Sequence, residues 1–311
     1  MKINKSRIKK KTSTGIIIFV KILILTGICF VVLYPQFEKL AISFMSVDDL
    51  YDSSVQYIPS QFSLNNYKRA IEYTDYWNTL IRTVLFVLLN SLLQVCSAML
   101  IGYGFARFDF KGKNILFGCV IATLIVPVQS FVVPLYKHFL GLKLLNTAFP
   151  ILLLSAGGIG LKSGLYIFLF RQRFAGIPKE LEESAKIDGA SHIRIFAQII
   201  WPLSKPILAT IAIFGAVGNW NSFTDSLILM SSKPELYTLQ HRLYIYLNQA
   251  SNLSALMQSG GSVSDSAVKS ALSGKVIKYT ISMVTVIPIL VVYPFMQRYF
   301  EKGIMLGAVK G

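Results

Sequence analysis

The stretch that decides the fold is Pro178-Lys-Glu-Leu-Glu-Glu-Ser-Ala-Lys-Ile-Asp-Gly-Ala190. It opens a charged, amphipathic insert (residues 178–206, the polar insert) that lies between two segments apolar enough to span a bilayer. Chains with so much apolar sequence usually keep their loops short. A long polar insert on one side of the membrane therefore predicts a docking surface.

The residues of the polar insert predict two short helices. Pro178 suits a helix start, Gly189 supplies the positive φ that ends a helix, and Ser191 is a suitable cap for the next one. One narrow face of the first helix carries small residues at its centre and consists of Leu181, Ser184, Ala185 and Asp188.

Composition indicates a polytopic membrane protein. Of the 311 residues, 53% are hydrophobic and 15% are charged, and the mean hydropathy is +0.55. The net charge of +16 does not indicate nucleic-acid binding, because the basic residues lie in short loops beside apolar segments, where they orient a membrane protein. The cysteines and histidines show no disulfide or metal-ligand spacing.

Six apolar segments are long enough to cross a hydrocarbon core of about 30 Å, so we expect an all-α fold with six transmembrane helices. The fourth is the weakest, because Gly157, Gly158, Gly160 and Lys162 interrupt it. The six segments are residues 16–37, 80–106, 114–136, 146–170, 204–230 and 277–297. The expected parts are 1–79 (basic N-terminus, first helix, first outer loop), 80–297 (membrane core with the loop 171–206) and 298–311 (tail).

The basic residues predict the orientation in the membrane. They gather in residues 1–11, after the second segment, in the polar insert and after the last segment, whereas the outer segment 38–79 holds few. The positive-inside rule then places both termini and the polar insert in the cytoplasm. We expect residues 1–11 to anchor an uncleaved first helix, since the apolar run that follows lacks a signal-peptide exit.

The polar insert resembles a known motif. Its spacing, Glu183-Ser-Ala185, Gly189 and Ile199-x-x-Pro202, is similar to the "EAA…G…I-x-L-P" loop of permease subunits of ABC importers. Ser184 replaces the usual Ala and Trp201 the usual Leu. In that family the loop forms a cytoplasmic coupling helix that seats in a groove of the ATPase subunit. The resemblance implies the type I importer fold and gives the coupling role to Glu182, Glu183, Ser184, Ala185, Asp188, Gly189 and Ala190.

Three other stretches resemble the carbohydrate-uptake, maltose-type branch of these permeases. They are Gly102-Tyr-Gly-Phe-Ala-Arg-Phe-Asp-Phe-Lys-Gly-Lys113, in which Gly112 permits a bend, Asn219-Trp-Asn-Ser-Phe223, and the C-terminal Tyr293-Pro-Phe-Met-Gln-Arg-Tyr-Phe-Glu-Lys-Gly-Ile-Met-Leu-Gly-Ala-Val-Lys-Gly311. The resemblance implies a subunit of a bacterial plasma-membrane importer of sugars, with oligosaccharides expected. Its implied partners are a second, non-identical permease, an ABC ATPase homodimer and an extracellular lipoprotein or periplasmic sugar-binding protein.

The C-terminal tail is expected to contact a partner. Glycines at every fourth position from Gly303 to Gly311 disfavour a free-standing helix, and apolar residues lie between them. In relatives with this signature the tail reaches the ATPase dimer interface, and the alternative is a solvated end with an amphipathic foot on the bilayer. The resemblance gives this contact to Ile304, Met305, Leu306, Gly307, Ala308 and Val309.

Polar residues in the fifth segment predict a sugar path, because ionisable and amide groups inside a membrane mark pathways. Amides and carboxylates bond sugar hydroxyls, and aromatic rings stack on sugar faces. The candidate residues are Trp220, Asn221, Phe223, Thr224 and Asp225. The alternative, left open here, is that Asn219, Asn221 and Asp225 bond neighbouring helices and hold the bundle together. Weaker candidates are Asn90, Gln94, Gln129 and Ser130.

No catalytic, metal or nucleotide site is expected in this chain. A phosphate-binding loop needs G-x-x-x-x-G-K-(S/T), and the nearest match, Gly160-Leu-Lys-Ser163, lacks the second glycine. ATP and Mg are expected on the partner ATPase, and no nucleophile–base pattern predicts an enzyme. The alternative function is an ion- or proton-coupled secondary transporter acting alone. It would need several deep ionisable residues, and the sequence offers only Asp225.

Two outer segments are long. Residues 38–79 are rich in Tyr, Phe and Trp, which favours an interfacial aromatic belt or, alternatively, contact with the sugar-delivery protein. Residues 231–275 contain Ser259-Gly-Gly-Ser-Val-Ser-Asp-Ser266, which is typical of a flexible chain.

Overall fold

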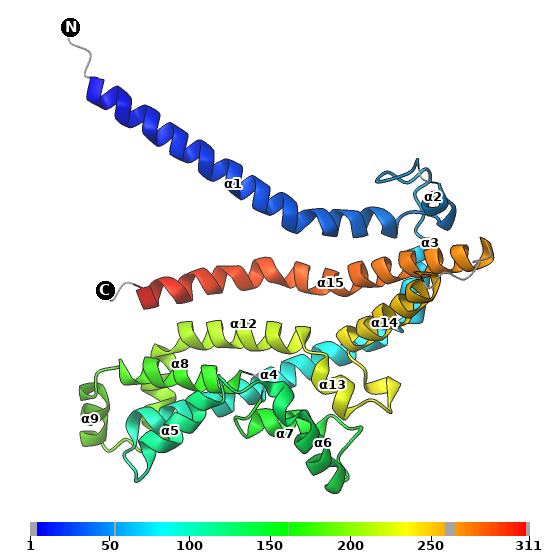
Figure 1. Ribbon diagram of the computed structural model, residues 1–311. Helices are drawn as coiled ribbons and strands as arrows, with labels where there is room; N and C mark the ends of the chain where they lie inside the picture. The colour runs from blue at the N-terminus through cyan, green and yellow to red at the C-terminus, as the bar shows by residue number, and fades with distance from the viewer. Residues whose placement is uncertain (1–4, 53, 161, 259–264, 309–311) are drawn as a thin grey trace. The chain divides into compact units, whose positions relative to one another are not determined.

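The computed structural model describes the backbone of residues 5–52, 54–160, 162–258 and 265–308, and side chains within 15–52, 54–127, 130–160, 162–248 and 272–297. Every regular element in these ranges is a helix (Figure 1), which confirms the predicted all-α fold. The chain divides into two compact units, residues 1–71 with 247–284 and residues 72–246 with 285–311.

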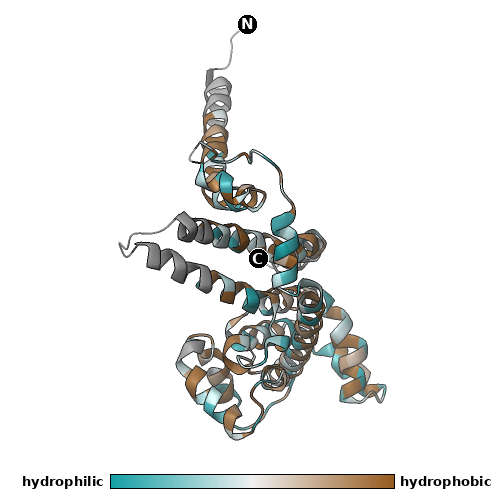
Figure 2. Ribbon diagram, turned by 90° about the vertical axis from the view of Figure 1, so that its right-hand side faces the viewer, coloured by the Kyte–Doolittle hydropathy of each residue, from teal (hydrophilic) through white to brown (hydrophobic). Residues whose placement is uncertain are grey.

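The first unit is built around a long apolar helix. Its elements are α1 (Lys5–Ser43), α2 (Val47–Tyr51) and most of α3 (Asn65–Tyr73), with parts of α14 (Leu239–Gln258) and α15 (Asp265–Ala308). The apolar stretch of α1 is Gly15–Ser43 (Figure 2 colours the hydrophobic residues brown), and none of its most apolar window is buried against described residues. Ser46 starts α2 with a capping box, in which its hydroxyl accepts from the Asp49 amide at 3.0 Å.

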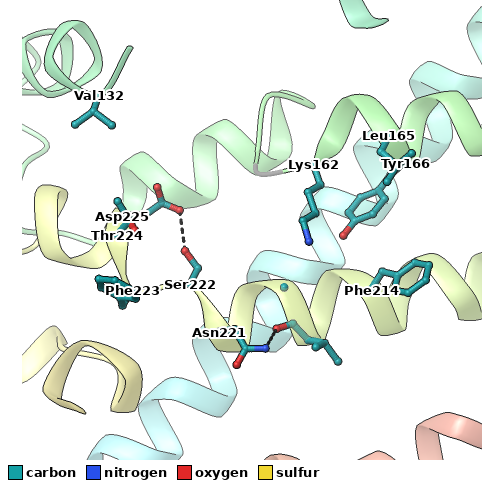
Figure 3. Close-up of a pocket in the computed structure, with 12 residues that line it drawn as sticks. Val132, Lys162, Leu165, Tyr166, Phe214, Asn221, Ser222, Phe223, Thr224 and Asp225 are labelled. Carbon is teal, nitrogen blue, oxygen red and sulfur yellow. Dashed lines mark hydrogen bonds between the residues drawn. The ribbon is translucent and has the colours of Figure 1, made fainter. Parts of the chain in front are cut away.

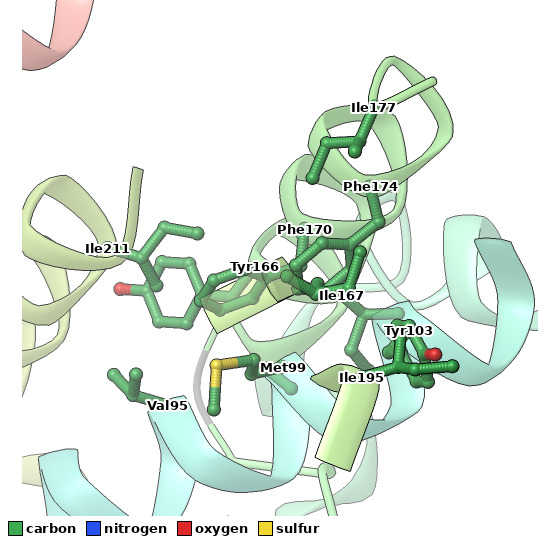
Figure 4. Packing of buried hydrophobic residues seen from close by; sticks show 12 residues of the cluster. Val95, Met99, Tyr103, Tyr166, Ile167, Phe170, Phe174, Ile177, Ile195 and Ile211 are labelled. Atoms are coloured by element: carbon green, nitrogen blue, oxygen red, sulfur yellow. The ribbon is translucent and has the colours of Figure 1, made fainter. Parts of the chain in front are cut away.

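The second unit is organised on α4 (Tyr76–Arg107), against which α7 (Phe149–Ala156), α8 (Ser163–Ala175) and α12 (Lys205–Asn221) pack (Figure 1). Gly102 allows the close approach of α4 to α8, because a Cβ there would lie 2.7 Å from the Phe170 Cβ. The core of this contact (Figure 4) includes Val95, Met99, Tyr103, Tyr166, Ile167, Phe170, Phe174, Ile177, Ile195 and Ile211.

Shorter elements complete the second unit. They are α5 (Lys113–Ala122), η1 (Val128–Phe131), α6 (Val132–Gly141), α9 (Glu180–Ile187), α10 (His192–Ile195), the π-helical η2 (Phe196–Ile200), α11 (Trp201–Leu203), α13 (Thr224–Leu229) and η3 (Pro234–Leu236). Gly112, with φ of 82°, makes the turn from α4 to α5, as predicted.

Three described helices are long and apolar enough to cross a membrane: Gly15–Ser43, Tyr76–Arg107 and Leu272–Gln297. A fourth crossing is available if the bent pair His192–Leu203 and Lys205–Asn221, which meet at 79°, forms one span. The continuous helices predicted over 114–136, 146–170 and 204–230 are not present, since each region is divided between shorter helices. Six crossings therefore stay a prediction.

Local residue chemistry explains these breaks. Pro127 follows α5 and disfavours helical backbone in the residue before it. Between α7 and α8, Gly158 (φ 74°) and Lys162 (φ 62°) adopt left-handed backbone. After α12, Ser222 is extended, with ψ of 123°, and its hydroxyl donates to Asp225 Oδ2 at 3.3 Å.

Some sequence predictions fall outside the described residues. These are the basic side chains of residues 1–11, most of the Ser/Gly-rich segment 259–266, and the tail side chains 304–309. The backbone of the tail is described as far as Ala308 and is helical, as part of α15. The tail thus continues a longer helix and is not a free-standing one, and its predicted contact with a partner stays a prediction.

Candidate functional site

The polar insert has the local turns predicted from its sequence. Helix α9 is followed by Gly189, whose φ is 78°, and Ser191 then caps α10, its hydroxyl accepting from the Arg194 amide at 3.4 Å. The first turn of α9 carries Glu180, Glu182 and Glu183, whose charges complement the positive end of the helix dipole.

The predicted coupling residues divide between two faces of α9. Glu182 is buried, and Ala185 and Ala190 pack partly against the α4–α8 core. The exposed face carries Glu183, Ser184, Asp188 and Gly189, together with Leu181 and Ile187, of which Ile187 is 88% exposed. An exposed face with large apolar side chains beside acids fits a docking surface.

Glu182 is held by Arg107, at the end of α4. The Arg107 Nε lies 2.5 Å from Glu182 Oε1, and the two side chains are only 6% and 8% exposed. Arg107 Nη2 also donates to the Ile177 carbonyl at 2.8 Å. Arg107 thus attaches both α9 and the turn before it to the membrane core. Sequence reasoning did not pair these two residues.

A cavity of about 540 Å³ lies within the second unit, between α8, α12 and α13 (Figure 3). Its polar side chains come from Lys162, Tyr166, Asn221, Ser222, Thr224 and Asp225, and its apolar wall includes Val132, Leu165, Phe214, Val217 and Phe223. Amides, hydroxyls and a carboxylate beside aromatic rings match the chemistry of a carbohydrate site.

Four of the five predicted path residues line this cavity: Asn221, Phe223, Thr224 and Asp225. They lie together although the helix breaks at Ser222. Asn221 Nδ2 donates to the Val217 carbonyl of its own helix at 3.0 Å, and Phe223 stacks on Tyr244 at 4.7 Å between ring centroids. The fifth residue, Trp220, is buried and is not part of the cavity lining.

Asn219 instead has the bundle-holding role. Its Nδ2 donates to Ser91 Oγ at 2.9 Å and to Gln94 Oε1 at 3.3 Å, and Gln94 Nε2 donates to Ser163 Oγ at 3.0 Å. These bonds join α12, α4 and α8. Asn90 and Gln94 are buried in α4, Ser130 is exposed, and the Gln129 side chain lies outside the described residues.

Sequence reasoning missed Lys162 and Tyr166 as cavity residues. Lys162 was noted only as an interruption of the fourth segment, yet a lysine inside a predicted membrane segment is itself a signal for a pathway. Tyr166 carries no such signal, because a tyrosine in an apolar run is also typical of packing. In the described ranges, no group of three or more His, Cys, Asp or Glu side chains could hold a metal ion.

The chain is all helical, with an exposed amphipathic helix and a cavity between its helices that is lined by polar groups and an apolar wall. These features define the class of membrane permeases. The chain belongs to the family of binding-protein-dependent transport system inner membrane components, whose family model matches residues 98–306. It is therefore a transport permease and not an enzyme.

Curated relatives cover nearly the whole chain. Protein LplC of Bacillus subtilis is 31% identical over 93% of this chain and 93% of its own length. The polygalacturonan/rhamnogalacturonan transport system permease protein YtcP of Bacillus subtilis is 30% identical over 89% of this chain and 92% of its own. The arabinooligosaccharides transport system permease protein AraQ of Halalkalibacterium halodurans is 29% identical over 91% and 93%.

A solved structure shows the same fold. The crystal structure of a bacterial ABC transporter involved in the import of the acidic polysaccharide alginate contains a chain that matches with a TM-score of 0.74. The match covers 93% of this chain and 98% of that chain, at 22% identity. The fold is thus that of an ABC importer permease.

Proposed function

We propose that this chain is one of two non-identical permease subunits of an ATP-driven, binding-protein-dependent sugar importer, and that its cavity is part of an oligosaccharide path. The cavity chemistry carries the proposal, because Asn221, Thr224 and Asp225 offer bonds to hydroxyls and Phe223 offers a ring face. The transport systems named for AraQ and YtcP, which handle oligo- and polysaccharides, support the same substrate class.

The exposed face of α9 is the surface proposed for the ATPase homodimer, which binds ATP and Mg; this chain itself needs no cofactor. The sugar reaches the outer side of a bacterial plasma membrane on a lipoprotein or periplasmic binding protein. Both termini and the polar insert lie in the cytoplasm, in agreement with the distribution of basic residues. The secondary-transporter alternative has no support, since the cavity lining contains a single acid, Asp225.

Proteoliposomes with the complete complex test this function. Uptake from a panel of arabino-, galacto- and galacturono-oligosaccharides should require ATP and the binding protein, and should not respond to a proton or sodium gradient. Uptake by this chain alone, driven by such a gradient, would overturn the proposal.

Two variants of α9 test the docking surface. Glu183→Lys and Gly189→Asp should lose co-purification with the ATPase as well as ATP-driven uptake. Glu235→Lys, which inverts an exposed acid outside the polar insert, is the matched control and should bind the ATPase normally. Wild-type ATPase binding by both α9 variants would remove this face from the mechanism.

A further inference from the structure

We propose that Lys162 and Tyr166 form an anion-binding end of the cavity, which receives the carboxylate of an acidic, uronic-acid-containing oligosaccharide. This inference rests on the proposed function, because it names the substrate class for the same cavity. Three observations carry it: the position of Lys162, the free hydroxyl of Tyr166, and the separation of the cavity's cation from its acid.

Lys162 points into the cavity from the break between α7 and α8 (Figure 3). It is the residue before α8 and has φ of 62°, a left-handed conformation that lysine seldom adopts. Its ammonium group has no ion-pair partner among the described residues. An unpaired cation inside a predicted membrane segment is costly and is a functional-site hypothesis by default.

Tyr166 lies one helical turn further along α8. Its side chain is 1% exposed, yet it lines the cavity, and Figure 3 shows its hydroxyl directed toward α12. There the opposing residue is Gly218, whose ideal Cβ would lie 3.9 Å from Tyr166 Oη. No hydrogen bond to this hydroxyl is made within the described part of the chain. A hydroxyl that reaches the cavity and has no partner there is available to donate to a ligand.

The acid of the cavity lies apart from this end. Asp225 belongs to α13, where its carboxylate accepts from Ser222, and Figure 3 shows Asp225 and Lys162 on different sides of the cavity. One end therefore offers a cation, a hydroxyl donor and the positive end of the α8 dipole. The other end offers acceptors for sugar hydroxyls. A saccharide with a carboxylate matches both ends, and a hydrogen bond from an ammonium group to a carboxylate is stronger than one between neutral groups.

Direct binding tests this assignment. The complex of this chain with its second permease and ATPase, held in nanodiscs without the binding protein, is titrated calorimetrically with α-1,4-linked trigalacturonate and with its fully methyl-esterified form. The two probes differ in charge and little else. Lys162→Asn removes the charge but tolerates left-handed backbone, and Lys162→Arg keeps the charge. Lys143→Asn is the matched control, because Lys143 also has positive φ (55°) and lies away from the cavity.

The wild-type complex should bind trigalacturonate more tightly than the ester. Lys162→Asn should raise the Kd for trigalacturonate by about tenfold or more and leave that of the ester unchanged. Tyr166→Phe should raise the Kd for trigalacturonate by a smaller factor. Lys162→Arg and Lys143→Asn should bind trigalacturonate with a Kd near that of the wild type. Equal binding of both probes by the wild type, or an unchanged Kd in Lys162→Asn, would overturn the inference.

The two levels of proposal fail in different ways. ATP-driven import of neutral oligosaccharides by a complex that does not distinguish the probes would reject the acidic substrate and keep the sugar importer. Absence of ATP-driven import of any oligosaccharide in the panel would reject both.

Discussion

The buried ion pair between Arg107 and Glu182 holds α9, which carries the exposed acidic face of the polar insert, against the end of α4. The coupling motif presents Glu183 and Asp188 outward, but Glu182 turns inward and is neutralised by the end of α4. Taking two charges out of water is expensive, and the pair persists because each charge has its counterpart. The pair fixes the position of α9 on α4, together with the packing of Ala185 and Ala190 against the α4–α8 core.

Removing one member of this ion pair should therefore strongly destabilise the folded chain. Arg107→Met leaves the Glu182 carboxylate buried without its cation, and we expect a loss of roughly 3–5 kcal/mol in stability, seen as a lower thermal unfolding midpoint in detergent. Asp109→Asn breaks the neighbouring Lys113–Asp109 pair, whose acid is 92% exposed, and should change stability far less, because solvent screens an exposed pair. Similar losses in the two variants would contradict the anchoring role.

His241 predicts a pH-dependent stability. It is 1% exposed, its Nδ1 lies 2.9 Å from Ser226 Oγ, and burial, with help from Arg242, lowers its pKa to about 4. In the unfolded chain the imidazole has an ordinary pKa near 6.5. Between about pH 6.5 and 4 it is therefore protonated in the unfolded chain and neutral in the folded one. Stability should therefore fall as the pH drops from about 6.5 toward 4 and should not change further through this group below that.

Thermal unfolding across this pH range measures the effect. His241→Asn keeps a hydrogen-bonding side chain beside Ser226 and should show a flatter decline than the wild type. His138→Asn replaces an exposed histidine and should follow the wild type. A wild-type slope in His241→Asn would assign the pH dependence to other groups.

At the scale of elements, the contact of α4 with α8 depends on a missing side chain. A Cβ on Gly102 would meet the Phe170 Cβ at 2.7 Å and the Arg171 amide nitrogen at 3.1 Å. Gly102→Ala should therefore destabilise by about 1–3 kcal/mol, although alanine favours helix. Gly104→Ala meets nothing within 4 Å and should be neutral or stabilising by up to about 1 kcal/mol. Comparison of the thermal unfolding midpoints of the two variants tests this. A Gly102→Ala midpoint equal to that of the wild type would show that α4 and α8 can move apart to accept the methyl group.

The tail is a second element with a prediction. We propose that Ile304–Val309 contacts the ATPase dimer, as the resemblance implies. Deleting residues 303–311 should then weaken ATPase coupling or complex assembly while membrane insertion stays normal, as measured by co-purification and by the amount of chain in membranes. Wild-type transport by an assembled, truncated complex would remove the tail from the mechanism.

Elements also show what the sequence could and could not predict. The turns at Gly112 and Gly189 and the cap at Ser191 depend on local backbone chemistry, so they were predicted correctly. The breaks at Lys162 and Ser222 were not predicted. Glycines and Lys162 mark the fourth segment as the weakest, but its length and apolar residues still predict one span, and the apolar residues around Ser222 predict a continuous fifth span. Most path residues were found from polar groups in an apolar segment. Lys162 carried the same signal, but it lies in a different segment from the other path residues, and only the folded chain shows that both segments line one cavity.

At the scale of the whole molecule, the number of crossings is open to a direct test. If all six segments cross, alkaline phosphatase fused after Asn146 or after Gln258 should be active, because both sites lie outside, and a fluorescent protein fused after Gly311 should fold in the cytoplasm. An inactive fusion at Asn146 with an active one at Gln258 would mean that the two broken segments, 114–136 and 146–170, re-enter the membrane, leaving four crossings.

The long helix α1 has a consequence for the lipid. The apolar stretch Gly15–Ser43 has 29 residues and is therefore about 43 Å long at 1.5 Å per residue, against a hydrocarbon thickness of about 30 Å. Such hydrophobic mismatch is relieved by tilting or by local thickening of the bilayer. The most apolar window of α1 is not buried against described residues, and within the described part of the chain the hydrophobic packing of α1 lies near its C-terminal end, at Ala41 and Ile42. The angle of α1 should therefore follow acyl-chain length, and membrane thickness becomes a variable of the assembled transporter.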